Sequence, residues 1–251
     1  MNIPIPTVIS LVLSTKSDMS IFKFSPKMPV RLVFDSFSLL MVILCLAYYW
    51  QGNKVHEWLG AALFLFIALH NTYNRLWYRH INKHIKKPKP LIIVLLNGCL
   101  ILTALTLLMT SLLVSREVLP NISENPGYFI RSVHIAAGYW LFALVAMHAG
   151  LNGNKVASWF TRYSFIRKAP VHIGMKLLLA AVSIQGIISF KEMVMVDKLT
   201  MNPVLFMWDF SNLPGFIFHH ISIFVFISFT TFYTMHRMRW KNWLKASKEN
   251  A

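Results

Sequence analysis

The chain has 251 residues, of which 56% are hydrophobic and 14% charged, and its mean hydropathy is +0.52. This composition is typical of a membrane protein, and it excludes a disordered chain, a coiled coil and a secreted disulfide scaffold. The two cysteines, Cys45 and Cys99, stand singly in apolar runs, which excludes iron–sulfur clusters and covalently attached c-type heme. In such a chain a net charge of +16 indicates membrane orientation and contact with anionic lipid, so we expect no nucleic-acid partner.

The N-terminal segment 3–14 is apolar but too short to span a bilayer, and no basic region precedes it. We therefore expect residues 1–30 to form a cytoplasmic tail and not a cleaved signal peptide. Six longer apolar runs follow, each near the twenty residues that a hydrocarbon core of roughly 30 Å requires. The sequence predicts an all-α polytopic membrane protein with six transmembrane helices, at 32–50, 57–77, 91–114, 129–150, 173–190 and 216–235.

Basic residues alternate in density between successive connections. Twenty of the twenty-five lysines and arginines lie in the N-terminal tail, in 75–89, in 155–176 and from 237 onward. By the positive-inside rule these segments are cytoplasmic, as are both termini. The predicted domain comprises three hairpins, 31–78, 91–152 and 173–238, followed by a basic tail, 239–251. The outer connection 191–215 is predicted to be an amphipathic connector or, around Trp208, a stretch lying in the membrane interface.

Two of the predicted helices contain the same pattern, HxxxGx(9)HxxxN. The first copy consists of His56, Gly60, His70 and Asn74, and the second of His134, Gly138, His148 and Asn152. Fourteen residues correspond to about 1,400° of helical rotation, so the two histidines of each copy share nearly one face, about 21 Å apart. Both helices run in the same direction, because one returning helix separates them. We expect His56 level with His134 near the outer surface, and His70 level with His148 near the inner surface.

Facing imidazole pairs of this kind match the six-coordinate iron of a heme that stands edge-on between two helices. The repeat therefore predicts two b-type hemes, one ligated by His56 and His134 and the other by His70 and His148. Histidines in membrane helices also serve as interhelical hydrogen-bond partners, and that simpler role is the alternative for each of them. A shared spacing of fourteen residues is not required by the simpler role.

Other residues of the repeat and its ends fit the same heme-binding interpretation. Gly60 and Gly138 each follow the first histidine by four residues, where a missing side chain would let a flat macrocycle approach the backbone. Arg131 at the outer end and Arg75 at the inner end are candidate partners of heme propionates.

The last predicted helix carries three further histidines, His219, His220 and His236. Neither His219 nor His220 shares a helical face with His236, which argues against a third heme of the same kind. We expect helix packing for this group, with quinone or propionate binding as the alternative.

Asp35 lies one turn into the first predicted helix, four residues after Arg31, and a local ion pair is its simplest role. A proton relay is the alternative, although no further acidic residues continue a path across the membrane. We expect three other histidines to be solvated, His80, His84 and His172.

The residues around the repeat resemble a known family. The stretches RLVFDSFSLL from Arg31 and HEWLGAALFLFIALHNTYNRLWY from His56 resemble the flavinylation-associated cytochrome domain, and RSVHIAAGYWLFALVAMHAGLNG from Arg131 resembles its second half. The resemblance covers residues 31–154 well. It implies a multi-pass b-type cytochrome of the bacterial inner membrane that passes electrons to extracytoplasmic flavin-bearing partners. Its heme ligands would be the four histidines of the repeat, and the absence of a flavin-binding domain leaves the partner open.

The expected function is transmembrane electron transfer from the quinone pool or the cytoplasmic side to an extracytoplasmic acceptor. Hemes closed at both axial positions argue against oxygen activation. The sequence leaves open a bound quinone, and membership of a quinol-oxidising or ferric-reductase-like oxidoreductase. Two other functions compete: a histidine-lined transition-metal transporter and a non-catalytic membrane assembly protein.

Overall fold

A computed structural model of the chain describes residues 28–79, 81, 88–119, 127–160, 163, 169–203 and 208–249. These residues form helices and contain no strand, which confirms the all-α prediction. The helices are α2 (Met28–Leu46), α3 (Tyr48–Tyr73), α4 (Arg75–Arg79), α6 (Pro88–Val114), α7 (Tyr128–Phe160), α8 (Ala169–Glu192), α9 (Met195–Thr200) and α10 (Leu213–Glu249).

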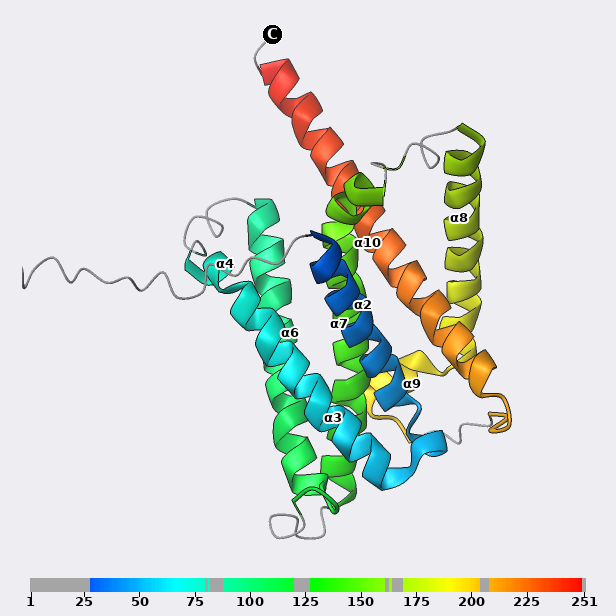
Figure 1. The fold of residues 1–251 in the computed structure, drawn as a ribbon. Helices are drawn as coiled ribbons and strands as arrows, with labels where there is room; N and C mark the ends of the chain where they lie inside the picture. The colour runs from blue at the N-terminus through cyan, green and yellow to red at the C-terminus, as the bar shows by residue number, and fades with distance from the viewer. Residues whose placement is uncertain are drawn as a thin grey trace, which may run out of the picture.

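The six long helices run alternately up and down the bundle (Figure 1). The start of α2 and the ends of α3, α7 and α10 all lie at one end of the molecule. Those are the helix ends from which the segments rich in lysine and arginine continue. The fold therefore places at one end the helix ends that flank the basic segments, as the charge pattern requires.

Four of the helices are long and apolar enough to cross a membrane: Leu91–Val114, Tyr128–Ser158, Ile173–Glu192 and Leu213–Met235. In α2 the apolar part is shorter, Leu32–Leu46, and α3 does not qualify. The reason in α3 is polarity at both ends, where His56, Glu57, His70 and Asn71 interrupt the apolar run. The chain is thus an all-helical membrane protein with four candidate spans among its described residues.

Several predicted helix ends are wrong: that of 129–150 falls ten residues short of the end of α7 at Phe160, and two others are off by about one turn. The first predicted helix ends at Leu46 instead of Trp50, and the chain reverses into α3 at a kink at Gly52. Gly52 has φ 69°, a left-handed conformation that glycine adopts without steric cost. The second predicted helix ends at Tyr73 instead of Trp77, where the Asn74 amide donates to the His70 carbonyl oxygen at 2.9 Å.

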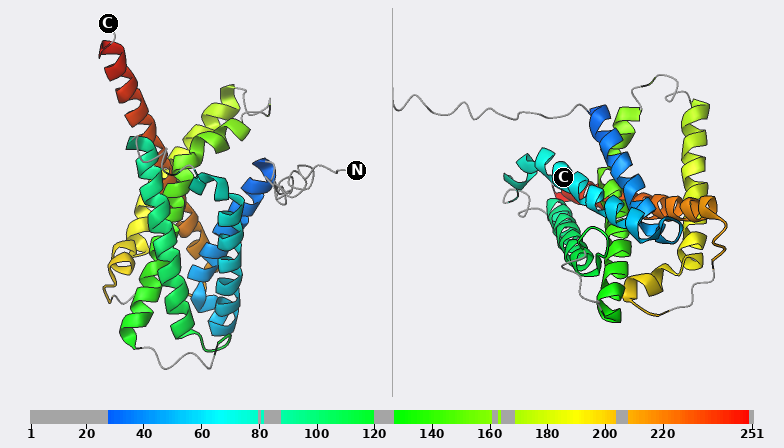
Figure 2. Two further views of the ribbon diagram at one scale, coloured as in Figure 1. Left: turned by 90° about the vertical axis from the view of Figure 1, so that its left-hand side faces the viewer. Right: turned by 60° about the horizontal axis from the view of Figure 1, so that its bottom comes forward.

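The helices form a row in which α6 and α8 lie at opposite edges and α7 and α10 lie between them (Figure 2). Contacts are most extensive along α8–α10, α6–α7 and α7–α10. Helix α3 packs mainly against α2 and has no extended backbone contact with α7 or α6. The two helices that carry the repeat are therefore held apart.

The main core joins α2, α3, α7, α10 and the region before α9. Fully buried side chains there include Phe142, Ile223, Met193 and Met195. The predicted interfacial stretch around Trp208 falls partly outside the described residues, since 204–207 are not among them. In the connection 191–215 the structure contains the short helix α9, whose Met195 is buried in the bundle together with Met193, two residues before it.

Candidate functional site

The structure brings together the histidines that the repeat pairs. The ring centres of His56 and His134 are 6.1 Å apart, and those of His70 and His148 are 6.5 Å apart. The ring planes cross at 75° and 76° in the two pairs. Similar distances and angles at both levels follow from a shared spacing on two helices that run in the same direction.

The separation of the rings is that of two ligands on one metal ion. Metal–imidazole bonds of about 2 Å on opposite sides of an ion place the two ring centres roughly 6 Å apart. Both pairs match this distance. No hydrogen bond joins the two rings of either pair among the described residues, so direct pairing of the imidazoles does not explain their approach.

The pair at one end of the bundle is oriented by side chains of the flanking helices. His70 Nδ1 donates to the Asp35 carboxylate on α2 at 3.1 Å, and His148 Nδ1 donates to the Asn97 side-chain oxygen on α6 at 3.0 Å. The Asn152 amide lies 3.2 Å from His148 Nε2 and 3.0 Å from the His148 carbonyl oxygen. If His148 ligated a metal through Nε2, the Asn152 amide would no longer donate to that nitrogen and would keep only its hydrogen bond to the His148 carbonyl oxygen.

In the pair at the other end, His56 and His134, the hydrogen-bond partner behind the ring is uncharged. His134 Nδ1 donates to the Thr110 hydroxyl oxygen on α6 at 3.1 Å. The Thr110 proton is engaged by the Thr106 and Leu107 carbonyls at 2.9 and 3.0 Å, so its oxygen is free to accept from the ring. The Cys45 carbonyl faces the ring of His56, whose Nδ1 has no partner in hydrogen-bond geometry among the described residues.

These hydrogen bonds decide which nitrogen of each ring carries the lone pair. A neutral imidazole that donates through Nδ1 has its lone pair on Nε2, the nitrogen left to bind a metal. Such an acceptor behind a ligating histidine is the usual companion of a metal site. Three of the four histidines have one, supplied by Asp35, Thr110 and Asn97. The residues present therefore fit two bis-histidine hemes.

Gly60 and Gly138 have open space where a side chain would stand. A Cβ at Gly60 would meet no described atom within 4 Å, and one at Gly138 would meet only the Leu46 side chain at 3.7 Å. Neither glycine is needed for helix packing. The space in front of them agrees with clearance for a flat group between α3 and α7.

An apolar layer separates the two histidine levels. Leu107 of α6 and Ala137 and Leu141 of α7 are buried there against Phe64 and Ile67 of α3. These α3 residues lie between His56 and His70 in the chain, and the α7 residues lie between His134 and His148. The layer closes the gap between the helices midway, so the structure defines two separate sites.

The other predicted site residues either lie near the two histidine pairs or are not among the residues and side chains that the structure describes. Arg131 is exposed three residues before His134, and Arg75 begins α4 five residues after His70. The positions His80 and His84, and the side chains of His172 and His236, are not among those described. The side chain of Arg31 is also outside the description, and the described partner of Asp35 is His70.

His219 and His220 belong to a different cluster, between α8 and α10. His219 Nδ1 lies 2.9 Å from the Ser189 hydroxyl and 3.3 Å from the Glu192 carboxylate. His220 is fully buried and donates through Nδ1 to the Phe216 carbonyl at 2.8 Å. No pair of facing histidines occurs among the described side chains of this cluster.

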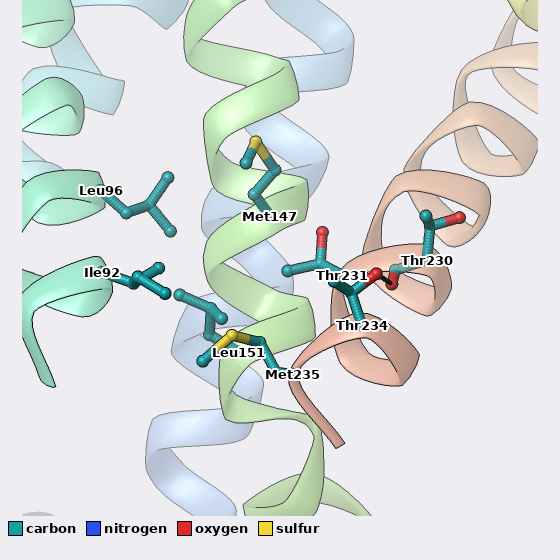
Figure 3. A pocket seen from close by; sticks show the side chains of 8 residues that line it. All are labelled: Ile92, Leu96, Met147, Leu151, Thr230, Thr231, Thr234 and Met235. Carbon is teal, nitrogen blue, oxygen red and sulfur yellow. Dashed lines mark hydrogen bonds between the residues drawn. The ribbon is translucent and has the colours of Figure 1, made fainter. Parts of the chain in front are cut away.

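A pocket of about 320 Å³ lies between α6, α7 and α10 (Figure 3). Its lining is apolar apart from three threonines, of which Thr231 and Thr234 donate to carbonyl groups of their own helix at 2.8 Å. No histidine of either pair lines it. The pocket therefore offers apolar surface and is distinct from the histidine sites.

The sequence analysis missed the residues that support the histidines. Asn97 is a single amide within the apolar run of α6, and that isolation was the available signal. Glu57 anchors the start of α3 to the end of α6. Its carboxylate accepts five hydrogen bonds of 2.7 to 2.9 Å, from the side chains of Asn53 and Ser115 and from the backbone N–H groups of Arg116, Glu117 and Val118.

The fold and site together define an all-helical membrane protein with two stacked histidine pairs. No protein-family model matches the chain, and neither a curated protein nor a solved structure gives a match. The function is therefore inferred from the geometry of the two histidine pairs.

Proposed function

We propose that the protein is a bis-histidine diheme b-type cytochrome that transfers single electrons across a membrane. The observation that carries this proposal is the pair of ring separations, 6.1 and 6.5 Å, at both ends of one repeat. Heme would supply a one-electron carrier at each level, held by His56 and His134 at one level and by His70 and His148 at the other.

The chain's own residues would perform three tasks. Asp35, Asn97 and Thr110 hold the imidazole tautomers that expose Nε2. Gly60 and Gly138 leave room for a flat group beside the helix backbone. Arg75 and Arg131, placed near the two levels, are the proposed partners of acidic side groups of the cofactor.

The proposed membrane topology has six spans, with α2 and α3 joining the four apolar helices. The reversal at Gly52 lets α2 and α3 form a hairpin beside α7. Both termini would face the cytoplasm of a bacterial inner membrane, by the positive-inside rule. Electrons would pass from the cytoplasmic side or the quinone pool to an extracytoplasmic acceptor, with a flavin-bearing protein as the acceptor that the family resemblance implies.

The competing functions explain less of the geometry. A transition-metal transporter would present sites of three or four ligands, whereas no group of three or more His, Cys, Asp or Glu that could hold a metal ion occurs among the described residues. Hydrogen-bond roles account for the Nδ1 atoms of His70, His134 and His148. They leave unexplained the Nε2 atoms of His70 and His134, which have no hydrogen-bond partner within the described part of the chain.

The test is the visible spectrum of the full chain purified in detergent, reduced and oxidised, with heme quantified as its pyridine complex. We expect two hemes per chain. His70→Ala and His148→Ala should each lose the same heme and keep the other, and His56→Ala and His134→Ala should lose the second one. His172→Ala, outside both pairs, serves as the control and should keep two hemes.

Two results would overturn the proposal. One is a heme-free protein that binds zinc or copper in stoichiometric amounts instead. The other is an unchanged heme content in the four histidine variants, with elution and helix content showing that each is folded.

A further inference from the structure

The two histidine pairs differ in the charge of the groups behind them. His70 donates to a carboxylate, whereas His134 and His148 donate to the neutral oxygens of Thr110 and Asn97. Asp35 is thus the one acidic side chain that contacts a histidine of either pair within the described residues. The side chains of His70 and Asp35 are 37% and 53% exposed, so the contact lies at the rim of the bundle and not in its core.

A carboxylate that accepts a hydrogen bond from an imidazole changes the reduction potential of the metal ion that the imidazole binds. Accepting the Nδ1 proton raises the electron density on Nε2 and makes the ring a more basic ligand. A more basic ligand and a nearby negative charge both stabilise the oxidised, more positive form of the ion. The reduction potential at that level falls as a result. A neutral hydroxyl or amide oxygen does the same to a smaller extent.

Two other charged groups, Lys155 and Glu57, act on the histidines through space without contacting them. At the His70–His148 level the Lys155 ammonium group donates to the Asn152 side-chain oxygen at 2.9 Å, not to a histidine. At the other level Glu57 neighbours His56 in the chain. Its carboxylate is engaged by five donors and does not bond to the His56 ring.

We propose that Asp35 is a positioning residue that sets the order of the two reduction potentials, with the His70–His148 level below the His56–His134 level. This inference rests on the proposed diheme function. With heme held at both levels, one electron would pass from the His70–His148 level, which would be oxidised, to the His56–His134 level, which would be reduced. The order gives the molecule a preferred direction, from the end with the basic segments toward the opposite end.

The experiment is a spectroelectrochemical titration of the full chain in detergent, which resolves one wave for each heme. His70→Ala identifies the wave of its level by removing it. Asp35→Asn keeps a side chain of the same shape and an oxygen that accepts a hydrogen bond, but removes the charge. We expect it to shift the identified wave to a higher potential and to narrow the gap between the two waves. Asp35→Glu should restore most of the gap.

Thr110→Val is the matched control, because it removes the neutral acceptor of His134 and leaves Asp35 intact. It should leave the wave of the His70–His148 level in place. The inference is overturned if Asp35→Asn retains both hemes at unchanged potentials, or shifts both waves equally. If Asp35→Asn loses its heme, the wild type decides: the wave that His70→Ala removes must be the lower one, and the opposite order overturns the inference. A wild type without heme overturns the proposed function instead.

Discussion

The two halves of the bundle use glycine in opposite ways. Between α7, α8 and α10, a Cβ at Gly150 would collide with the Ser228 carbonyl oxygen, and one at Gly186 with the Ser222 carbonyl oxygen. In the half with α3, a Cβ at Gly60 would meet nothing within 4 Å, and one at Gly138 would only touch the Leu46 side chain of α2 at 3.7 Å. The first half is packed by close backbone approach, as is common for membrane helices, and the second half is kept apart.

This difference separates packing from ligand binding in one small protein. The Ser228 hydroxyl on α10 donates to the Ala146 carbonyl on α7 at 2.8 Å, which adds a direct link to the packed half. In the other half, hydrogen bonds between helices run from the histidines to partners on α2 and α6, beside the apolar layer that packs α3 against α6 and α7. The packed half provides a rigid support, and the open half provides the space in which the proposed cofactors would bind.

The largest effect is expected from filling the open space. Gly60→Leu places a side chain between α3 and α7 beside His56, where the described residues leave room for it. The fold should persist, while the heme of the His56–His134 level is lost and the other is retained. Heme content with helix content and elution in detergent measures both effects. Two retained hemes would show that the space has another purpose.

A smaller effect, on stability alone, is expected from the packed half. Gly186→Ala forces α8 away from α10, and overpacking of this kind costs about 1–3 kcal/mol of unfolding free energy. Gly174→Ala, on the same helix with no neighbour within 4 Å, is the control and should be neutral. Thermal unfolding of both variants in detergent makes the comparison. Equal stability of the two would contradict the close contact.

The smallest effect is expected at the anchor that joins the halves of the site. Glu57→Ala leaves the backbone N–H groups of Arg116, Glu117 and Val118 without their acceptor. Because Glu57 is partly exposed, water replaces part of the lost hydrogen bonding, and we expect about 1 kcal/mol of destabilisation. The heme of the His56–His134 level should also become easier to extract than the other. Equal extraction rates at the two levels would limit Glu57 to a loop contact.

Much of this arrangement was readable in the sequence. The fourteen-residue spacing of His56 and His70, repeated at His134 and His148, predicted two levels because helical geometry fixes the rise and rotation per residue. The ends of α2 and α3 were less predictable, since a reversal at Gly52 and a cap at Asn74 depend on local backbone bonds. The short helix α9 was also not predicted, because tertiary burial of Met193 and Met195 stabilises it.

The sequence by itself determined the helical membrane character, the gathering of positive charge at one end and the register of the four histidines, because each follows from composition or from a local period. The tertiary structure alone decided that Asp35 reaches His70, that Thr110 and Asn97 back the histidines of α7, and that Gly60 and Gly150 have opposite roles. Such contacts depend on how separate helices are rotated and spaced against one another, and no single helix contains that information.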